Sequence, residues 1–318
     1  MRHCLIFVPM LLAALLWAPP HAAAQPDAEK TRVEGLLADG KTAWEKVRAY
    51  DRLHQKLADI HGGRGQALEK QGNKEAGGKE LARANDELLL ARQAYELALK
   101  RHPDSADLHN YYGELIFDRF DEQEQGVAEW KKAIELDDRQ SRAHNNLGIF
   151  LCHNGAYAEG LAALDKAVLL EPDNADYQYN LAQTYFVNWP QVMQIRKWTV
   201  KELYDAAMDA SRTAVKLAPN DFDLAVDYAR NFFMAGQMEI TPDWDGAAKA
   251  WQHARTIARN QDETFNTWLN EARVWYKAGK GGKAVKCCEE ALRLRPQSIA
   301  AKELMGMARE PNRTKPGK

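Results

Sequence analysis

The chain has 318 residues, and its 43 basic residues nearly balance its 45 acidic residues. This balance argues against binding driven by bulk charge, and a mean hydropathy of −0.57 excludes a multispanning membrane protein. Four cysteines are too few for a disulfide-dense scaffold, whereas nine Trp, eleven Tyr and nine Phe favour a folded core over disorder.

The first residues have the features of a secretory signal peptide. Arg2 gives a basic start, and the apolar run over 4–17 is too short to cross a bilayer comfortably. Small residues ending at Ala24 form the expected cleavage site. We therefore expect residues 1–24 to be removed, so that a protein of the periplasm or the secreted fraction begins near Gln25 and spans no membrane. The alternative is an uncleaved N-terminal anchor.

Residues 25–105 predict a pair of long helices. Apolar residues recur at helical spacing over 28–60, and Leu, Tyr and Ala recur every seven residues over 79–101. Glycines among charged residues predict that 62–78 is a flexible connector. We expect the pair to fold back as a hairpin that caps the following helices, and the alternative is self-association through residues 28–101 as a coiled coil.

A triplet with a small residue first and alanine last recurs six times, and its spacings of four and three place it on one helical face. The six copies are Ala91-Tyr95-Ala98, Gly126-Trp130-Ala133, Gly160-Leu164-Ala167, Ala207-Ser211-Ala214, Ala247-Trp251-Ala254 and Ala284-Cys288-Ala291. Pro103, Pro172, Pro219 and Pro296 follow four of these helices, where proline breaks no helical hydrogen bond. Two copies have Asp138 and Arg259 in place of that proline.

This pattern resembles the tetratricopeptide repeat (TPR), a helix-turn-helix unit of about 34 residues. Residues 141–174 match it best, with Leu147, Gly148, Tyr157, Leu164, Ala167 and Pro172 in the family's order. The resemblance implies an all-α, right-handed α-solenoid preceded by the N-terminal helical pair. The expected repeats are 106–140, 141–174, 175–221, 222–264 and 265–298, followed by a capping helix at 299–309 and a disordered tail at 310–318. Glu271 and Ser211 depart from the family's pattern, which has larger or apolar residues there.

In that family the first helices of the repeats line an inner groove that binds an extended peptide or a partner helix. The resemblance therefore implies a peptide groove in this chain, lined by polar residues at corresponding helical positions. The expected lining is Arg142, Asn145, Asn146, Ile149, Tyr179, Asn180, Gln183, Asp227, Arg230, Asn270 and Arg273. Asparagine amides suit a peptide backbone, and Arg230 and Arg273 suit a carboxylate. The alternative is a solvated polar face without a ligand.

Two repeats carry extra residues between their first and second helices, at 188–200 and 239–244. Stacking would place both insertions on one edge of the solenoid, so we predict an aromatic edge patch there. Its members would be Trp189, Arg196, Trp198 and Trp244. The alternative is that these tryptophans cover the core of their own insertions. Thr199 and Glu202 predict a capping box that begins a new helix.

The sequence has no His-Glu-x-x-His, Cys-x-x-Cys or Gly-x-Ser-x-Gly motif, and we assign no catalytic residue, metal or cofactor. His109 and His144 recur because they occupy equivalent repeat positions. We predict a non-enzymatic exported scaffold or adaptor that binds a protein or peptide and no nucleic acid. The alternative is an accessory or redox-linked protein that uses Cys287 and Cys288; with Cys152 they leave an odd number of thiols after signal removal.

Overall fold

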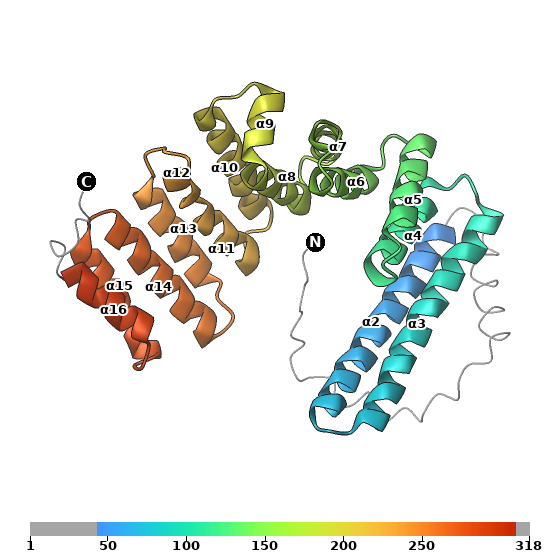
Figure 1. The fold of residues 1–318 in the computed structure, drawn as a ribbon, viewed down its shortest axis with the longest axis horizontal. Coiled ribbons are helices and arrows are strands. Elements are labelled where there is room, and N and C mark those ends of the chain that lie inside the picture. Colours follow the sequence, from blue (N-terminus) through green and yellow to red (C-terminus); the bar gives the residue numbers. More distant parts are fainter. Residues whose placement is uncertain (1–42, 310–318) are drawn as a thin grey trace. The chain divides into compact units, whose positions relative to one another are not determined.

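The computed structural model describes residues 43–309, and every regular element in that range is a helix (Figure 1). The expected signal peptide, the first part of the predicted helix at 28–60 and the tail at 310–318 lie outside the described residues. The helices are α2 (Ala43–Lys70), α3 (Lys74–Arg101), α4 (Ala106–Arg119), α5 (Gln123–Leu136), α6 (Ser141–His153), α7 (Tyr157–Leu170), α8 (Ala175–Val187), α9 (Trp189–Arg196), α10 (Val200–Leu217), α11 (Phe222–Asn231), α12 (Met234–Gln237), α13 (Trp244–Thr256), α14 (Gln261–Lys277), α15 (Gly281–Leu294) and α16 (Ile299–Arg309).

The chain forms two compact units that divide within α5, between Glu129 and Trp130. In the first unit, α2 and α3 form an antiparallel hairpin of two 28-residue helices. Its core joins Val47 and Tyr95 of the hairpin to Leu108 of α4. Asp51 is fully buried there, and its carboxylate accepts hydrogen bonds from Tyr95 at 3.0 Å and from Gln55 at 2.7 Å. Burying a carboxylate costs less free energy when several donors bond to it than when none does. These hydrogen bonds therefore order the end of the hairpin at which α2 begins and α3 ends.

The prediction of a flexible connector at 62–78 is wrong, because only residues 71–73 separate α2 from α3. Gly72 has a φ of +86°, which glycine adopts without strain, and it turns the chain between the two helices. A Cβ atom on Gly65 would lie 3.0 Å from the carbonyl oxygen of Gly77 and 2.7 Å from Leu81 Cγ. These two glycines therefore permit close helix crossing, which the composition of the segment did not distinguish from flexibility.

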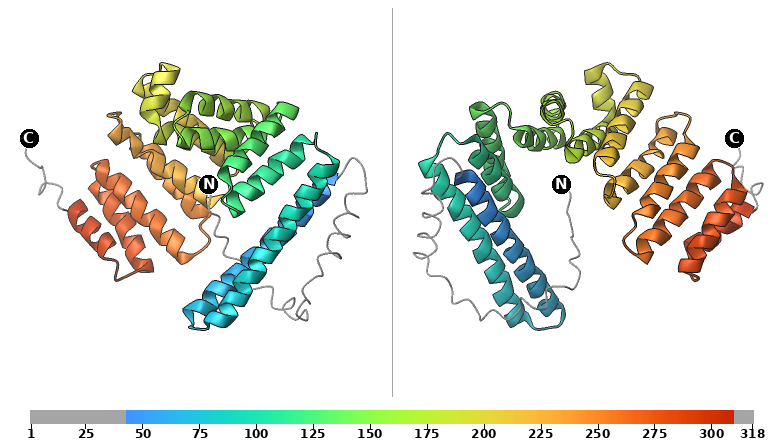
Figure 2. Two further views of the ribbon diagram at one scale, coloured as in Figure 1. Left: turned by 45° about the vertical axis from the view of Figure 1, so that its right-hand side comes forward. Right: turned by 180° about the vertical axis from the view of Figure 1, so that it is seen from behind.

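The second unit is built from successive helix pairs. Helix α6 packs on α7, α8 on α10, α11 on α13 and α14 on α15, and each pair also packs on the next (Figures 1 and 2). Small residues set the spacing within a pair, since a Cβ on Gly148 would lie 2.9 Å from the carbonyl oxygen of Gly160. At the C-terminal end, α16 covers α15 and buries Ala301 and Leu304. Helix α16 thus lies where the sequence predicts a capping helix.

The longer insertion forms a helix of its own, α9, before α10 begins. The predicted capping box at α10 is confirmed: Thr199 Oγ1 accepts a hydrogen bond from the backbone N–H of Glu202 at 3.2 Å, and the Glu202 carboxylate accepts one from the Thr199 N–H at 2.8 Å. The capping box ends the insertion and restarts the repeat. Over residues 43–309, no helix is both long enough and apolar enough to cross a bilayer.

Candidate functional site

Three first helices of the second unit, α6, α8 and α11, carry most of the predicted groove residues. Side-chain caps fix where two of these helices begin. Asn174 accepts hydrogen bonds from the backbone at the start of α8, and Asp221 accepts one from the N–H of Leu224 at 3.0 Å. We call six residues of these helices the first-helix face: Asn145, Asn146, Tyr179, Asn180, Asp227 and Arg230.

Amide side chains join α6 to α8 on this face. The Nδ2 atom of Asn180 donates to Asn145 Oδ1 at 3.0 Å, and Asn145 Nδ2 donates to Asn146 Oδ1 at 3.2 Å. Asn145 is buried, whereas Asn146 and Asn180 are half-buried. Because a buried amide must be hydrogen-bonded, Asn145 acts as the internal anchor that orients its two more accessible neighbours.

A second set of contacts joins α8 to α11. The Tyr179 hydroxyl donates to Asp227 Oδ2 at 2.9 Å, and Arg230 donates to Asp227 Oδ1 at 3.3 Å. The Arg230 side chain remains 65% exposed, and a guanidinium has five N–H donors. Tyr179 and Asn180 are adjacent on α8, so the two sets together link three successive first helices; we call them the polar strip.

The other predicted groove residues lie outside this strip of contacts. Ile149 packs against a hydrophobic cluster, and Gln183 is half-buried on α8. Arg142 is exposed at the start of α6. On α14, Arg273 donates to Asn270 Oδ1 at 2.7 Å, and Asn270 donates to the carbonyl of Asn266. These two residues form a pair within their own helix.

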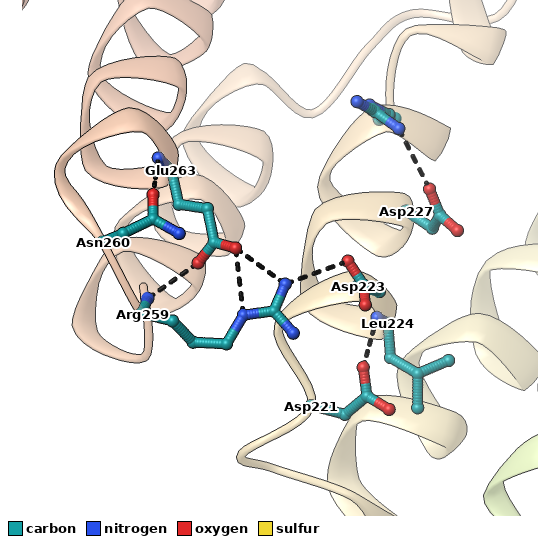
Figure 3. A network of polar contacts seen from close by, with 8 residues as sticks. Asp221, Asp223, Leu224, Asp227, Arg259, Asn260 and Glu263 are labelled. Atoms are coloured by element: carbon teal, nitrogen blue, oxygen red, sulfur yellow. Dashed lines mark hydrogen bonds and ion pairs between the residues drawn. The ribbon is translucent and has the colours of Figure 1, made fainter. Parts of the chain in front are cut away.

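Arg259, which replaces the repeat's proline, organises the contact between the starts of α11 and α14 (Figure 3). Its guanidinium donates to Glu263 Oε1 at 2.7 and 2.9 Å and lies 3.6 Å from Asp223 Oδ1. Its backbone N–H donates to Glu263 Oε2 at 2.7 Å, which a proline has no hydrogen to do. Arginine at this position thus links two repeats by side-chain contacts.

Glu271, one of the two departures from the repeat pattern, is the centre of a buried polar network that the sequence analysis missed. The residue is 2% exposed. Its carboxylate lies 2.7 Å from Arg255 and accepts hydrogen bonds from Gln252 at 2.6 Å and from Trp275 at 3.1 Å. Arg255 also stacks on the Trp268 ring at 3.4 Å. The sequence did offer one clue: Glu271 is acidic at a repeat position that is normally apolar, and a buried charge is commonly paired with an opposite one.

The recurring histidines have a structural explanation. His109 Nε2 lies 2.8 Å from the carbonyl oxygen of Pro103, and His144 Nε2 lies 3.1 Å from that of Asp138. Gln178 makes the same contact, six residues back, to the carbonyl of Pro172 at 3.1 Å. Ring and amide donors at this repeat position therefore satisfy a turn carbonyl two residues beyond the end of the preceding helix. Within the described range, no group of three or more His, Cys, Asp or Glu side chains is arranged to hold a metal ion.

The three tryptophans of the predicted edge patch divide between two hydrophobic clusters. Trp189 and Trp198 are half-buried in a cluster with Val192 and Leu203, whereas Trp244 packs on Phe233 in another. The tryptophans thus pack on helices of the repeats as well as on their own insertions, and binding of a partner at this edge stays a prediction.

Arg196 anchors α9 rather than standing free at the edge. It forms an ion pair with Asp165 of α7, and its guanidinium lies 5.8 Å from the centre of the Trp198 ring. Burial lowers the pKa of Arg196, but the hydrogen bond to Asp165, the charge of Asp165 and the interaction with Tyr185 together outweigh it, so the pKa is raised overall and the charge is retained. This pairing leaves a cation fixed between two repeats.

The three described cysteines are buried free thiols. Burial, reinforced by the nearby Glu271 carboxylate, raises the pKa of Cys287 to about 12. Burial likewise raises the pKa of Cys288 and of Cys152 to about 11. A thiol with a raised pKa holds little of the reactive thiolate at neutral pH.

Solved structures of known proteins share this fold. No family model matches the chain, and no curated protein matches it. Its structure is similar to that of YrrB, a TPR protein with an unusual peptide-binding site (TM-score 0.50, 18% identity, 67% of this chain and 97% of YrrB). It is also similar to the C-terminal part of a TPR repeat-containing protein from Cytophaga hutchinsonii (TM-score 0.52, 15% identity, 86% of this chain and 98% of that one). The all-α fold of paired helices predicted from the sequence is confirmed, because this chain shares its fold with these two tetratricopeptide-repeat proteins.

Proposed function

We propose that this protein is an exported, non-enzymatic scaffold that binds an extended segment of another protein on its first-helix face. The observation that carries the proposal is the polar strip that runs from Asn146 through Asn180 to Arg230. Residues from three helices converge there, and contacts among themselves hold them in fixed orientations. Export is the part of the proposal that rests on the signal-like residues 1–24.

The side chains of the strip are suited to hydrogen bonding with a peptide. An asparagine side chain offers both donors and acceptors, which match the N–H and C=O groups of any peptide backbone. Asn180 uses one of its two side-chain N–H donors in the hydrogen bond to Asn145. The side chain is therefore held in place and keeps hydrogen-bonding capacity for a peptide. Arg230 is mostly exposed and is suited to a carboxylate, which favours an acidic side chain or a C-terminus in the bound segment. YrrB, which shares the fold, is itself described by its peptide-binding site.

A redox role for Cys287 and Cys288 has less support. Both thiols are buried in the core between α14, α15 and α16, and their raised pKa values disfavour the thiolate that redox chemistry requires. No feature of the described residues favours a second candidate activity over binding.

The test uses peptides selected from a random displayed library against the chain beginning at Gln25. Affinities are then measured by calorimetry for the wild type, for Asn180→Ala/Arg230→Ala and for Arg212→Ala. Arg212 is the matched control, because it is an exposed arginine paired with Asp209 three residues before it, on the second helix α10. We expect the double variant to lose at least about tenfold in affinity and the control to stay within about twofold. Equal affinities for all three chains would remove the first-helix face as the binding site.

Export has a separate test. Mass spectrometry of the protein recovered from the exported fraction is expected to show a chain that begins at or near Gln25. Recovery of an intact N-terminus only in the cytoplasm would contradict export without affecting the binding proposal.

A further inference from the structure

Exposed lysines gather in the second unit where α13 and α15 begin and α14 ends. They are Lys249 of α13, Lys280 directly before α15, and Lys283 and Lys286 within α15. We call these four residues the lysine patch. Helix α14 packs on both α13 and α15, which brings these helix ends to one edge (Figure 1). None of the four lysines belongs to α6, α8 or α11, which carry the first-helix face.

One carboxylate and one aromatic ring hold part of the lysine patch together. Lys280 Nζ donates to both carboxylate oxygens of Asp245, at 2.9 and 3.0 Å, and so ties the turn before α15 to α13. The same ammonium lies 5.0 Å from the centre of the Trp275 ring, and that of Lys283 lies 4.0 Å from it. The hydrogen bond from Lys280 is the largest cause that lowers the pKa of Asp245. The charges of Lys283 and Lys249 lower it further, so both ammonium groups lie within electrostatic reach of this carboxylate.

The other carboxylates nearest to the patch along these helices are engaged by other groups. Asp243 accepts a hydrogen bond from the backbone at the start of α13. One turn beyond the patch on α15, Glu289 pairs with Arg309 at 3.7 Å and Glu290 with Arg293 at 2.7 Å. The first turn of α15 itself has no acidic residue. The lysine patch therefore keeps an excess of positive charge.

This arrangement favours an anion as the ligand. Lys280 and Lys283 place two like charges over one ring, and one carboxylate, Asp245, offsets a single charge. Like charges this close repel each other, and a bound carboxylate would relieve the repulsion. A mobile lysine loses conformational entropy when a ligand fixes it, but contacts with Asp245 and Trp275 already hold these two side chains.

We infer that the lysine patch binds an acidic segment of another protein. An ammonium is a compact charge on a flexible stem, so several of them suit a run of carboxylates better than one fixed geometry. Trp275 is 6% exposed, so the ring beneath the patch is not available to insert into a bilayer. A flat anionic surface would also bring its charges against Asp245, whereas a peptide can place a backbone N–H beside that carboxylate. This surface is an addition to the first-helix face and does not depend on binding there.

The test measures the fluorescence anisotropy of a labelled oligoglutamate peptide at low salt, titrated with the chain from Gln25 to Lys318. The wild type is expected to bind this peptide and not the matching oligoglutamine peptide. Lys249→Gln/Lys283→Gln/Lys286→Gln is expected to weaken binding at least about fivefold. Lys280 stays in place, because its ion pair with Asp245 joins two helices.

Two further variants separate the patch from bulk charge and from misfolding. Lys131→Gln/Lys201→Gln/Lys216→Gln removes the same charge from exposed lysines of α5 and α10 and is expected to bind within about twofold of the wild type. Arginine at positions 249, 283 and 286 keeps the charge of the patch and is expected to retain binding.

Four outcomes would overturn the inference. The first is a wild type that does not bind the oligoglutamate peptide at low salt. The second is a glutamine variant of the patch that binds as tightly as the wild type, and the third is a control variant that loses as much affinity as the patch variant. The fourth is binding to phosphatidylglycerol vesicles without binding to the peptide, which would assign the patch to a membrane surface.

Discussion

The side chain of Asn180 donates a hydrogen bond to the Oδ1 atom of Asn145 at 3.0 Å. This bond joins the first helices of two successive repeats and fixes the plane of both amides. A binding face whose side chains are already ordered loses less conformational entropy when a ligand arrives. Under the proposed function, the contacts that hold the repeats together also order the first-helix face for a peptide backbone.

The glycines of the hairpin are expected to respond in opposite directions to alanine. A Cβ on Gly65 would meet Leu81 and the backbone of Gly77, so Gly65→Ala should lower the free energy of unfolding by about 1–3 kcal/mol. Gly63 is the matched control, because a Cβ there meets nothing within 4 Å. Gly63→Ala should raise the free energy of unfolding by about 0.5–1 kcal/mol, since alanine is the better helix former. Urea unfolding followed by circular dichroism measures both, and stabilisation by both substitutions would contradict the close helix crossing.

The buried pair of Glu271 and Arg255 is expected to show strong coupling. Arg255→Met leaves the Glu271 carboxylate buried without its cation and should cost about 3–5 kcal/mol of stability. Glu271→Leu/Arg255→Met should recover most of that loss, because it removes both charges and restores the apolar residue usual at this repeat position. Unfolding of the single and double variants in urea measures the coupling. A double variant as unstable as Arg255→Met alone would show that the pair is not the source of the effect.

The three described thiols, those of Cys152, Cys287 and Cys288, are expected to be inert while the protein is folded. A thiol with a pKa of about 12, as for Cys287, is ionised at pH 8 in roughly one molecule in ten thousand. Titration of the chain beginning at Gln25 with a chromogenic disulfide reagent should therefore detect almost no thiol in buffer and three after denaturation. Rapid reaction of one or more thiols in the native protein would reopen the redox hypothesis.

The sequence predicted the core of the repeats well, because periodic packing leaves a periodic signal. Ala247, Trp251 and Ala254 share one helical face in the sequence, and all three are buried against the partner helices. The Thr199–Glu202 capping box was equally predictable, since both partners lie within one turn of helix. Features that depend on one element alone were thus accessible from the sequence.

Features that depend on a distant partner were less accessible. Glycine composition alone did not reveal that Gly65 and Gly77 face each other across a helix crossing. The partner of Glu271 lies on the preceding helix, 16 positions away, and nothing local identifies Arg255. The groove residues were predicted individually, but the contact that joins Tyr179 to Asp227 across 48 positions appears only in the folded chain.

The most direct test of the binding proposal is site-specific photocrosslinking to a selected peptide. A photoreactive phenylalanine replaces Gln183, which lies on α8 beside the strip, and in a matched chain it replaces the exposed Asp209 on α10. The account predicts that irradiation links the peptide to the chain modified at position 183 and leaves the chain modified at position 209 unlinked. Adducts at position 209 and none at position 183 would contradict binding on the first-helix face.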